Sequence, residues 1–83
     1  MTKDEAIDKA QEIAEVIGNG ITNGTLDDEI KKISDDDWDI YVKVTKSTLD
    51  EAFKDDPERA RNVGRIYNGT VQRREILKNK GEL

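Results

Sequence analysis

The stretch SDDDWDIYVKVTKSTLDEAF, residues 34–53, holds three of the four aromatic side chains of this chain. Two periodicities compete in it. Residues 38–45 alternate apolar with polar or aromatic residues, as a half-buried strand does. Spaced as in a helix, one stripe recurs at steps of three and four and consists of Trp38, Val42, Thr45, Leu49 and Phe53. The fold is all-α on the second interpretation and α+β on the first.

The rest of the chain favours the helix. No second run alternates comparably, so a strand at residues 38–45 would have no partner for its backbone groups. Ser34 followed by three aspartates is typical of a helix N-terminus, where a side-chain oxygen caps and negative charge is favourable. We therefore predict a helix from Asp35 to Lys54, with Trp38 in the core. Phe53 is expected there too, because the chain holds a single Trp and a single Phe.

Capping signatures mark three helix starts, each with a threonine followed by an acid three residues later: at Thr2, Thr25 and Thr48. The pattern predicts a first helix from Lys3 to Ile17, with the apolar stripe Ile7, Ala10, Ile13, Ala14 and Ile17. Gly18 is expected to end it and to open a flexible connection, residues 18–24, anchored by Ile21. Thr25 then caps a short helix carrying Leu26, Ile30 and Ile33. The signature at Thr48 offers a separate short helix inside residues 34–53 as an alternative.

The remaining boundaries follow from proline and glycine. Pro57 suits the first position of a new helix, which would carry Ala60, Val63 and Tyr67 inward. The pair Asn68-Gly69 is expected to close that helix, and Thr70 to open a last one containing Val71, Ile76 and Leu77. The prediction is a small single-domain bundle of four to six short helices over residues 1–83, with a disordered tail at residues 79–83.

Composition excludes several classes of protein. There are no cysteines and no histidines among the 83 residues, which removes disulfides, thiol chemistry and the usual catalytic base. No stretch is apolar enough to cross a bilayer, and the first ten residues do not resemble a signal peptide, so we expect a cytoplasmic protein without a membrane partner.

The sequence also gives little support for a catalytic or metal-binding site. The carboxylates lie outside apolar runs that would raise their pKa, so we predict that the chain is not an enzyme and holds no cofactor. Asp35, Asp37 and Asp39 have the opening spacing of a calcium loop. The match then fails, because Ile40 and Lys46 stand where the glycine and the glutamate belong. We therefore predict no metal site.

Charge is distributed unevenly along the chain. Residues 1–57 hold sixteen acids against seven lysines, a net charge of −9, and residues 58–83 hold three acids against seven basic residues, a net of +4. The structural interpretation is that these charges only keep a small domain in solution. The functional interpretation is an acidic face that steers a basic protein surface towards it, as small inhibitors encoded by phages and mobile elements do. That face would comprise Asp27, Asp28, Glu29, Asp35, Asp36, Asp37 and Asp39.

Two alternatives remain open. The basic C-terminal helices would bind nucleic acid through Arg61, Arg65, Arg73, Arg74 and Lys78, although the overall charge of −5 opposes long-range attraction to phosphate. A third class is a structural or self-assembling subunit, for which the partner is another copy of the chain. The preferred function is an acidic interaction module, plausibly an inhibitor or regulator that binds a nucleic-acid-binding protein.

Overall fold

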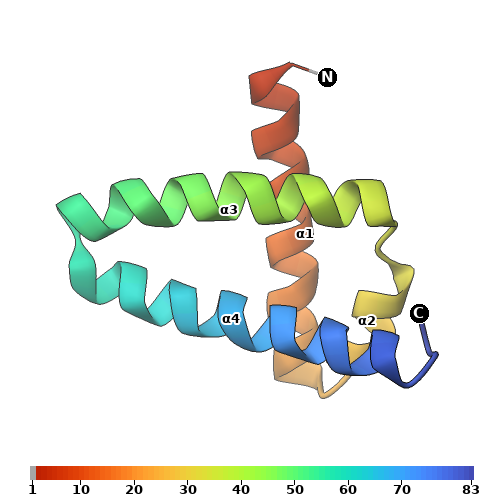
Figure 1. The fold of residues 1–83 in the computed structure, drawn as a ribbon. Coiled ribbons are helices and arrows are strands. Elements are labelled where there is room, and N and C mark those ends of the chain that lie inside the picture. The colour runs from red at the N-terminus through yellow and green to blue at the C-terminus, as the bar shows by residue number, and fades with distance from the viewer. Residues whose placement is uncertain (1) are drawn as a thin grey trace.

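The stretch that decides the fold is helical from Asp35 onward in a computed structural model, which describes residues 2–83. Residues 38–45 lie inside this helix, so the all-α prediction is confirmed and the strand alternative is wrong. The chain forms four helices, at the low end of the predicted range: α1 (Lys3–Asn23), α2 (Leu26–Lys32), α3 (Asp35–Asp55) and α4 (Pro57–Asn79) (Figure 1).

Side-chain caps fix most of the helix starts. The Thr2 hydroxyl accepts a hydrogen bond from the Glu5 amide at 3.2 Å, and the Ser34 hydroxyl accepts one from the Asp37 amide at 3.2 Å. Asp56 caps α4 in the same way, directly before Pro57. Thr25 precedes α2 as predicted, although its side chain makes no capping bond. The signature at Thr48 starts nothing, because α3 continues through it.

The first predicted helix end is wrong. α1 does not stop at Gly18 but runs through Gly20 to Asn23, and Gly24 supplies the left-handed residue that ends it, with φ of 73°. Residues 18–23 are therefore helix and not a flexible connection. The extra turn brings α1 against α2, where Gly20 allows close approach: a Cβ atom on Gly20 would lie 3.1 Å from the Cα atom of Leu26.

The second wrong boundary is in α4. Asn68-Gly69 does not close a helix and Thr70 does not open one, since α4 is continuous from Pro57 to Asn79. The Thr70 side chain is buried and donates a hydrogen bond to the Ile66 carbonyl at 2.8 Å. Its hydroxyl is thus satisfied by the preceding turn of the same helix and is not available as a cap.

An aromatic cluster occupies the centre of the core. Trp38 and Tyr41 have ring centroids 5.4 Å apart, and Tyr41 lies 5.8 Å from Tyr67, both pairs tilted. Aliphatic side chains from α1 and α3 complete the buried cluster: Ile13, Ile17 and Leu49. The prediction that Trp38 is a core residue is confirmed. The same prediction for Phe53 is wrong, because its side chain is 48% exposed.

The arrangement of the helices explains which apolar residues are covered. α3 and α4 lie antiparallel, α1 crosses behind them, and α2 packs against α1 and α4 (Figure 1). The joined ends of α3 and α4 extend past the crossing, so Phe53 there is left uncovered. Ala60 and Tyr67 are buried as predicted, but Val63 is 45% exposed.

On α1 the predicted stripe holds for its middle members, Ala10, Ile13 and Ile17, whereas Ala14 is exposed. Ile21, the expected anchor, is 46% exposed. After α4 the chain turns at Gly81, and Glu82 forms an ion pair with Lys31 of α2 at 3.1 Å. None of the helices described here is both long and apolar enough to cross a membrane.

Candidate functional site

The predicted acidic face comes from two helix starts. The first turn of α2 carries Asp27, Asp28 and Glu29, and the first turn of α3 carries three more acids. Acids in these positions are favoured by the positive end of the helix dipole, which is why the sequence folds locally as it does. Asp35, Asp37 and Asp39 are helical, so their backbone does not form the loop that a calcium site of the predicted spacing needs.

Arg73 of α4 forms an ion pair with one of these acids, Asp27. Its Nε and Nη2 atoms donate to the two carboxylate oxygens of Asp27, each at 2.6 Å. A bidentate pair of this kind is short and geometrically specific. The hydrogen bonds from Arg73 lower the pKa of the Asp27 carboxyl, and the same contacts raise the pKa of Arg73. Asp27 is therefore a structural group that holds α2 to α4.

Arg74 forms an ion pair with a second acid, Asp35, and also packs on the ring of Trp38. Its Nη2 atom donates to Asp35 Oδ1 at 2.7 Å, and its guanidinium carbon lies 4.8 Å from the centre of the Trp38 ring. The Arg74 side chain is only 14% exposed, whereas that of Asp35 is 94% exposed. Within residues 2–83 the Arg74 Nε atom has no hydrogen-bond partner. The ion pair with Asp35 and the cation–π contact with Trp38 together compensate for burying this charge.

The other acids of the predicted face divide into paired and unpaired groups. Lys9 of α1 lies 3.4 Å from Asp37, and Lys32 lies 3.6 Å from Glu29. Three acids form no ion pair in the part of the chain that the structure describes: Asp28, Asp36 and Asp39. The structure thus reduces the seven predicted residues to three free carboxylates, together with the exposed one of Asp35.

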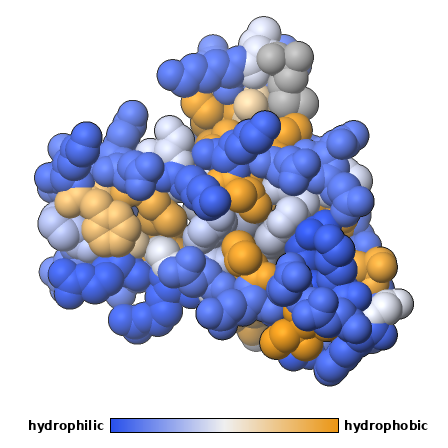
Figure 2. All heavy atoms as spheres, in the orientation of Figure 1, coloured by the Kyte–Doolittle hydropathy of each residue, from blue (hydrophilic) through white to orange (hydrophobic). Residues whose placement is uncertain are grey.

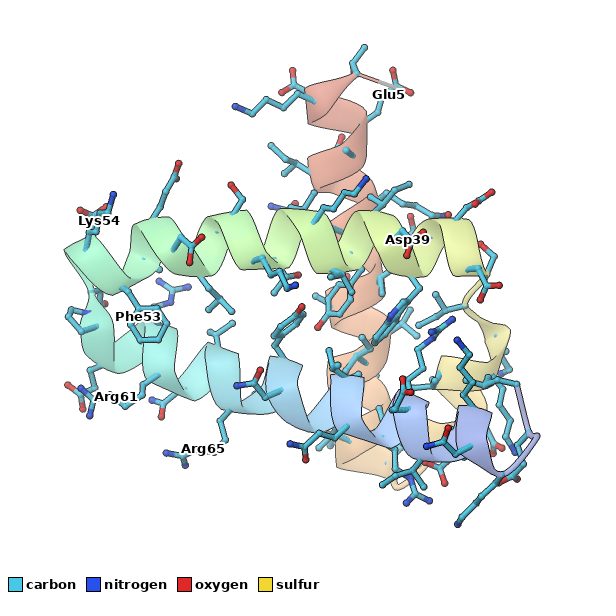
Figure 3. The ribbon with its side chains drawn as sticks, in the orientation of Figure 1. Glu5, Asp39, Phe53, Lys54, Arg61 and Arg65 are labelled. Carbon is cyan, nitrogen blue, oxygen red and sulfur yellow. The ribbon has the colours of Figure 1, made fainter. Side chains whose placement is uncertain are left out.

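The predicted basic residues are not one site. Arg73 and Arg74 pair with acids at the C-terminal half of α4, whereas Arg61 and Arg65 lie in its N-terminal half (Figure 3). Lys78 is near Arg74, around a recess of about 230 Å³ that Asp35 and Asp39 also line. Five residues that are close in sequence are therefore split between two ends of one helix.

A broad, shallow groove of about 840 Å³ lies between α3 and α4 near their joined ends. Arg61, Arg65 and Lys46 line it, beside Phe53 and Tyr67. Figure 2 shows an apolar patch in this region, bordered above and below by hydrophilic residues, and Figure 3 labels Phe53 there. The sequence predicted the arginines but not the exposed phenylalanine beside them.

Sequence reasoning missed a second groove, which is apolar. It has a volume of about 330 Å³ and lies between α1, α3 and α4, where Ala14, Val63 and Ile66 are among its walls. Because Val63 was predicted to point into the core, the exposed apolar surface that it forms was not predicted. The signal that could have found it is the helical spacing of Val63 and Ile66, which puts both on one face of α4.

Comparisons with known proteins add nothing to this picture: no protein-family model, no curated protein and no solved structure matches the chain.

Proposed function

We propose that this chain is a non-catalytic protein-interaction module that binds a basic surface of a partner protein through the free acids at the starts of α2 and α3. The observation that carries the proposal is that Asp28, Asp36 and Asp39 form no ion pair within residues 2–83, while their neighbours Asp27 and Asp35 are held by arginines. A carboxylate without a partner keeps its full attraction for an incoming positive charge.

The scaffold around these acids supports the proposal. Ser34 caps the turn that carries Asp36, and the contact of Arg74 with Trp38 fixes α3 against α4. The free acids therefore stand on helices held by a hydrogen bond and a packed cation, not on loops. A preorganised surface loses less entropy on binding than a flexible one. The net charge of −5 adds long-range attraction for a basic partner.

The proposal includes the absence of catalysis. Histidine and cysteine are missing from the sequence. The resolved pKa shifts have structural causes: the ion pair between Asp27 and Arg73, and the burial of Tyr41 and Tyr67. Burial raises the pKa of Tyr41 to about 12, which keeps that hydroxyl protonated at neutral pH. None of these groups is poised near neutral pH, where a general acid or base works best.

A matched pair of triple variants tests the acidic surface. The test variant, Asp28→Asn, Asp36→Asn and Asp39→Asn, removes the three free acids. The control, Asp50→Asn, Glu51→Gln and Asp55→Asn, removes three other acids of α3 that form no ion pair among the described residues. Both variants change the net charge equally, so a difference between them reports position and not total charge.

The experiment uses each tagged protein to capture partners from a native lysate, with elution by increasing salt and identification of bound protein and bound nucleic acid separately. We expect a basic protein that the wild type and the control retain and that the test variant loses. A partner that duplex DNA displaces would support imitation of nucleic acid by the acids. Equal capture by all three proteins would remove this surface from consideration.

One observation favours a second function, which is binding of nucleic acid in the groove between α3 and α4. Arg61, Arg65 and Lys46 line that groove beside Phe53, and cations next to an exposed aromatic ring suit a single strand. The variant Arg61→Gln with Arg65→Gln should then abolish a gel shift with single-stranded DNA at low salt. Arg73→Gln should not, because Arg73 is bound to Asp27. No gel shift with the wild-type protein would dispose of this function.

A further inference from the structure

The apolar groove between α1, α3 and α4 is an open side of the core. α1 and α4 each pack against α3 and against α2, but they are not a packed pair with each other within residues 2–83. The space between them is the groove of about 330 Å³. As a result Val63 and Ile66, which lie three residues apart on α4, remain 45% and 52% exposed.

The α1 wall of this groove is uncovered at Ala14 and Gly18, where the side chains are small. Ala14 is exposed, and a Cβ atom added to Gly18 would meet nothing within 4 Å. Ile7 and Ile21 continue the same stripe towards the two ends of the helix, and Ile21 is 46% exposed. Small side chains in the middle of a stripe let a second helix approach closely, since the distance between packed helices depends on the side chains at the contact.

The chain as a whole exposes more surface than a compact monomer of its mass. The accessible surface is 5934 Å², whereas a monomer of 9.4 kDa is expected to expose about 5,000 Å². The radius of gyration is 12.8 Å, against about 11.8 Å expected for 83 residues. The excess surface is close to the roughly 800 Å² that each partner buries in a standard interface.

The charges beside the groove identify the occupant. α1 carries five acids and two lysines, and α4 carries two acids and six basic residues. Glu15 follows the groove residue Gln11 by one turn of α1, and Arg59 precedes Val63 by one turn of α4; both charged residues are exposed. One rim is therefore acidic and the other basic. α1 of a second copy brings acids to the basic rim on α4, and by symmetry the basic α4 of that copy meets the acidic rim on α1.

We propose that two copies of this chain form a symmetric dimer in which α1 of each copy fills the groove between α1 and α4 of the other. In one copy α1 lies behind the layer that α3 and α4 form (Figure 1). A two-fold axis alongside α1 sets the two α1 helices next to each other between the two α3–α4 layers. Val63 and Ile66 are then covered by α1 of the second copy, and the interface is isologous and closed. The dimer leaves the acids at the starts of α2 and α3 outside it, so it stands independently of the proposed function.

The first test measures mass in solution by sedimentation equilibrium. We expect the wild type to approach twice 9.4 kDa at micromolar concentration. Ile66→Glu and Ala14→Glu should raise the dissociation constant by on the order of a hundredfold, because each buries an unpaired charge in the interface. Both positions are exposed in the monomer, so its helix content by circular dichroism should not change. The matched control, Phe53→Glu, alters an apolar residue outside this groove and should leave the dimer intact.

A chemical test uses the absence of cysteine in the sequence. Ala14→Cys introduces the single thiol next to the proposed axis and should form a disulfide-linked dimer under mild oxidation. Asn19→Cys, about 140° away around the same helix, should not. Restored association in Arg59→Glu combined with Glu15→Arg, compared with Arg59→Glu alone, would place the two rims together.

Three results would overturn the proposal. The first is a wild type that stays at 9.4 kDa up to roughly 100 μM, a concentration at which even a weak specific dimer with a micromolar constant is fully formed. The second is a dimer that Ile66→Glu leaves unchanged. The third is a dimer in which Ala14→Cys links no faster than Asn19→Cys. A monomer whose groove binds a helix of a different protein would belong to the first of these results.

Discussion

The two halves of α4 are held to the molecule in opposite ways. In the C-terminal half Leu77 is 1% exposed, and Arg73 and Arg74 bind acids of α2 and α3. In the N-terminal half Ala60 and Tyr67 are buried on the side that faces the core, but Val63 and Ile66 are about half exposed. The N-terminal arginines Arg59, Arg61 and Arg65 form no ion pair among residues 2–83. One continuous helix thus has a docked end and an open end.

Both halves are helical, and both carry charged and apolar residues. These properties alone therefore do not determine whether a segment packs against the rest of the molecule. What differs is the set of neighbours. α2 and the start of α3 surround the C-terminal half. The N-terminal half runs alongside α3 and extends beyond the place where α1 crosses (Figure 1). The open half is therefore where the groove residues and the unpaired arginines occur together, and where a further molecule has room to bind.

The largest expected effect contrasts one aliphatic residue from each half. Leu77→Ala should lower the free energy of unfolding by about 2–5 kcal/mol, because it removes a fully buried side chain and leaves a cavity. Ile66→Ala should lower the free energy of the monomer by less than about 1 kcal/mol, since half of that side chain is already in water. Urea unfolding followed by circular dichroism, at a concentration where the chain is monomeric, measures both. Equal losses would show that the two halves are equally docked.

The next effect contrasts two arginines. Arg74→Ala should cost about 1–2 kcal/mol, because the side chain covers Trp38 and its cation interacts with the ring. Arg65→Ala should change the free energy of unfolding by less than about 0.5 kcal/mol, since Arg65 is exposed and unpaired in the described residues.

The chain's single tryptophan provides a direct readout. Loss of Arg74 exposes the Trp38 ring to water, so the folded variant should show fluorescence at longer wavelength than the wild type or Arg65→Ala. An unshifted spectrum together with wild-type stability would mean that Arg74 does not hold α4 in place.

Around the docked end of α4, part of the structure could be predicted from the sequence and part could not. The cap at Ser34 was predictable because it depends on residues within a few positions of each other. The burial of Trp38 was predictable because a chain with a single Trp and a single Phe has few large apolar side chains for its core. The lack of a second alternating run was also enough to decide between helix and strand. The ion pairs of Arg73 with Asp27 and of Arg74 with Asp35 were not predictable, since 46 and 39 residues separate the partners. Charges that are segregated along the chain therefore neutralise one another in the fold.

The open half shows why the remaining predictions failed. Whether Phe53 or Val63 is covered depends on where α1 crosses α3, and a stripe of apolar residues does not contain that information. Glycines behaved in the same way. Gly18 and Gly69 can adopt the conformation that ends a helix, but they do so only when nothing favours continuation of the helix. Here the packing of the following turn favours continuation. The acids at the starts of α2 and α3 were found, but which of them stay free required the structure.

Glycine substitutions separate tight contacts from open surface. Gly20→Ala should destabilise by about 1 kcal/mol, because its Cβ atom would lie 3.1 Å from the backbone of Leu26 and 3.2 Å from the Glu29 side chain. Gly69→Ala, in the middle of α4 with nothing within 4 Å, should stabilise by about 0.5–1 kcal/mol through better helix propensity. Thermal unfolding of the two variants should shift in opposite directions. A shift in the same direction would contradict the close packing of α1 on α2.

The smallest effect concerns pH at the docked end. The hydrogen bonds from Arg73 lower the pKa of Asp27 below its ordinary value of 3.8. A carboxyl whose pKa is lower in the folded than in the unfolded state stabilises the fold above the unfolded pKa, and this contribution is lost as pH falls through the folded value. Asp27→Asn should therefore be less stable than the wild type at about pH 7. The gap should narrow as pH falls below that ordinary value, because the wild-type carboxyl then also becomes protonated in the folded state.

Asp28→Asn is the control, since Asp28 has no cation partner in the described chain and sits one position away in the same turn. It should show a smaller loss at neutral pH than Asp27→Asn, because it removes only the favourable charge at the start of α2, which both variants lose. The difference between the two variants therefore reports the contact with Arg73. Added salt should narrow the gap for Asp27→Asn, because both partners are 39% exposed and an ion pair of that kind is screened. A gap that persisted at low pH would mean that Asp27 stabilises the docked end by packing, and the bidentate contact would then account for none of it.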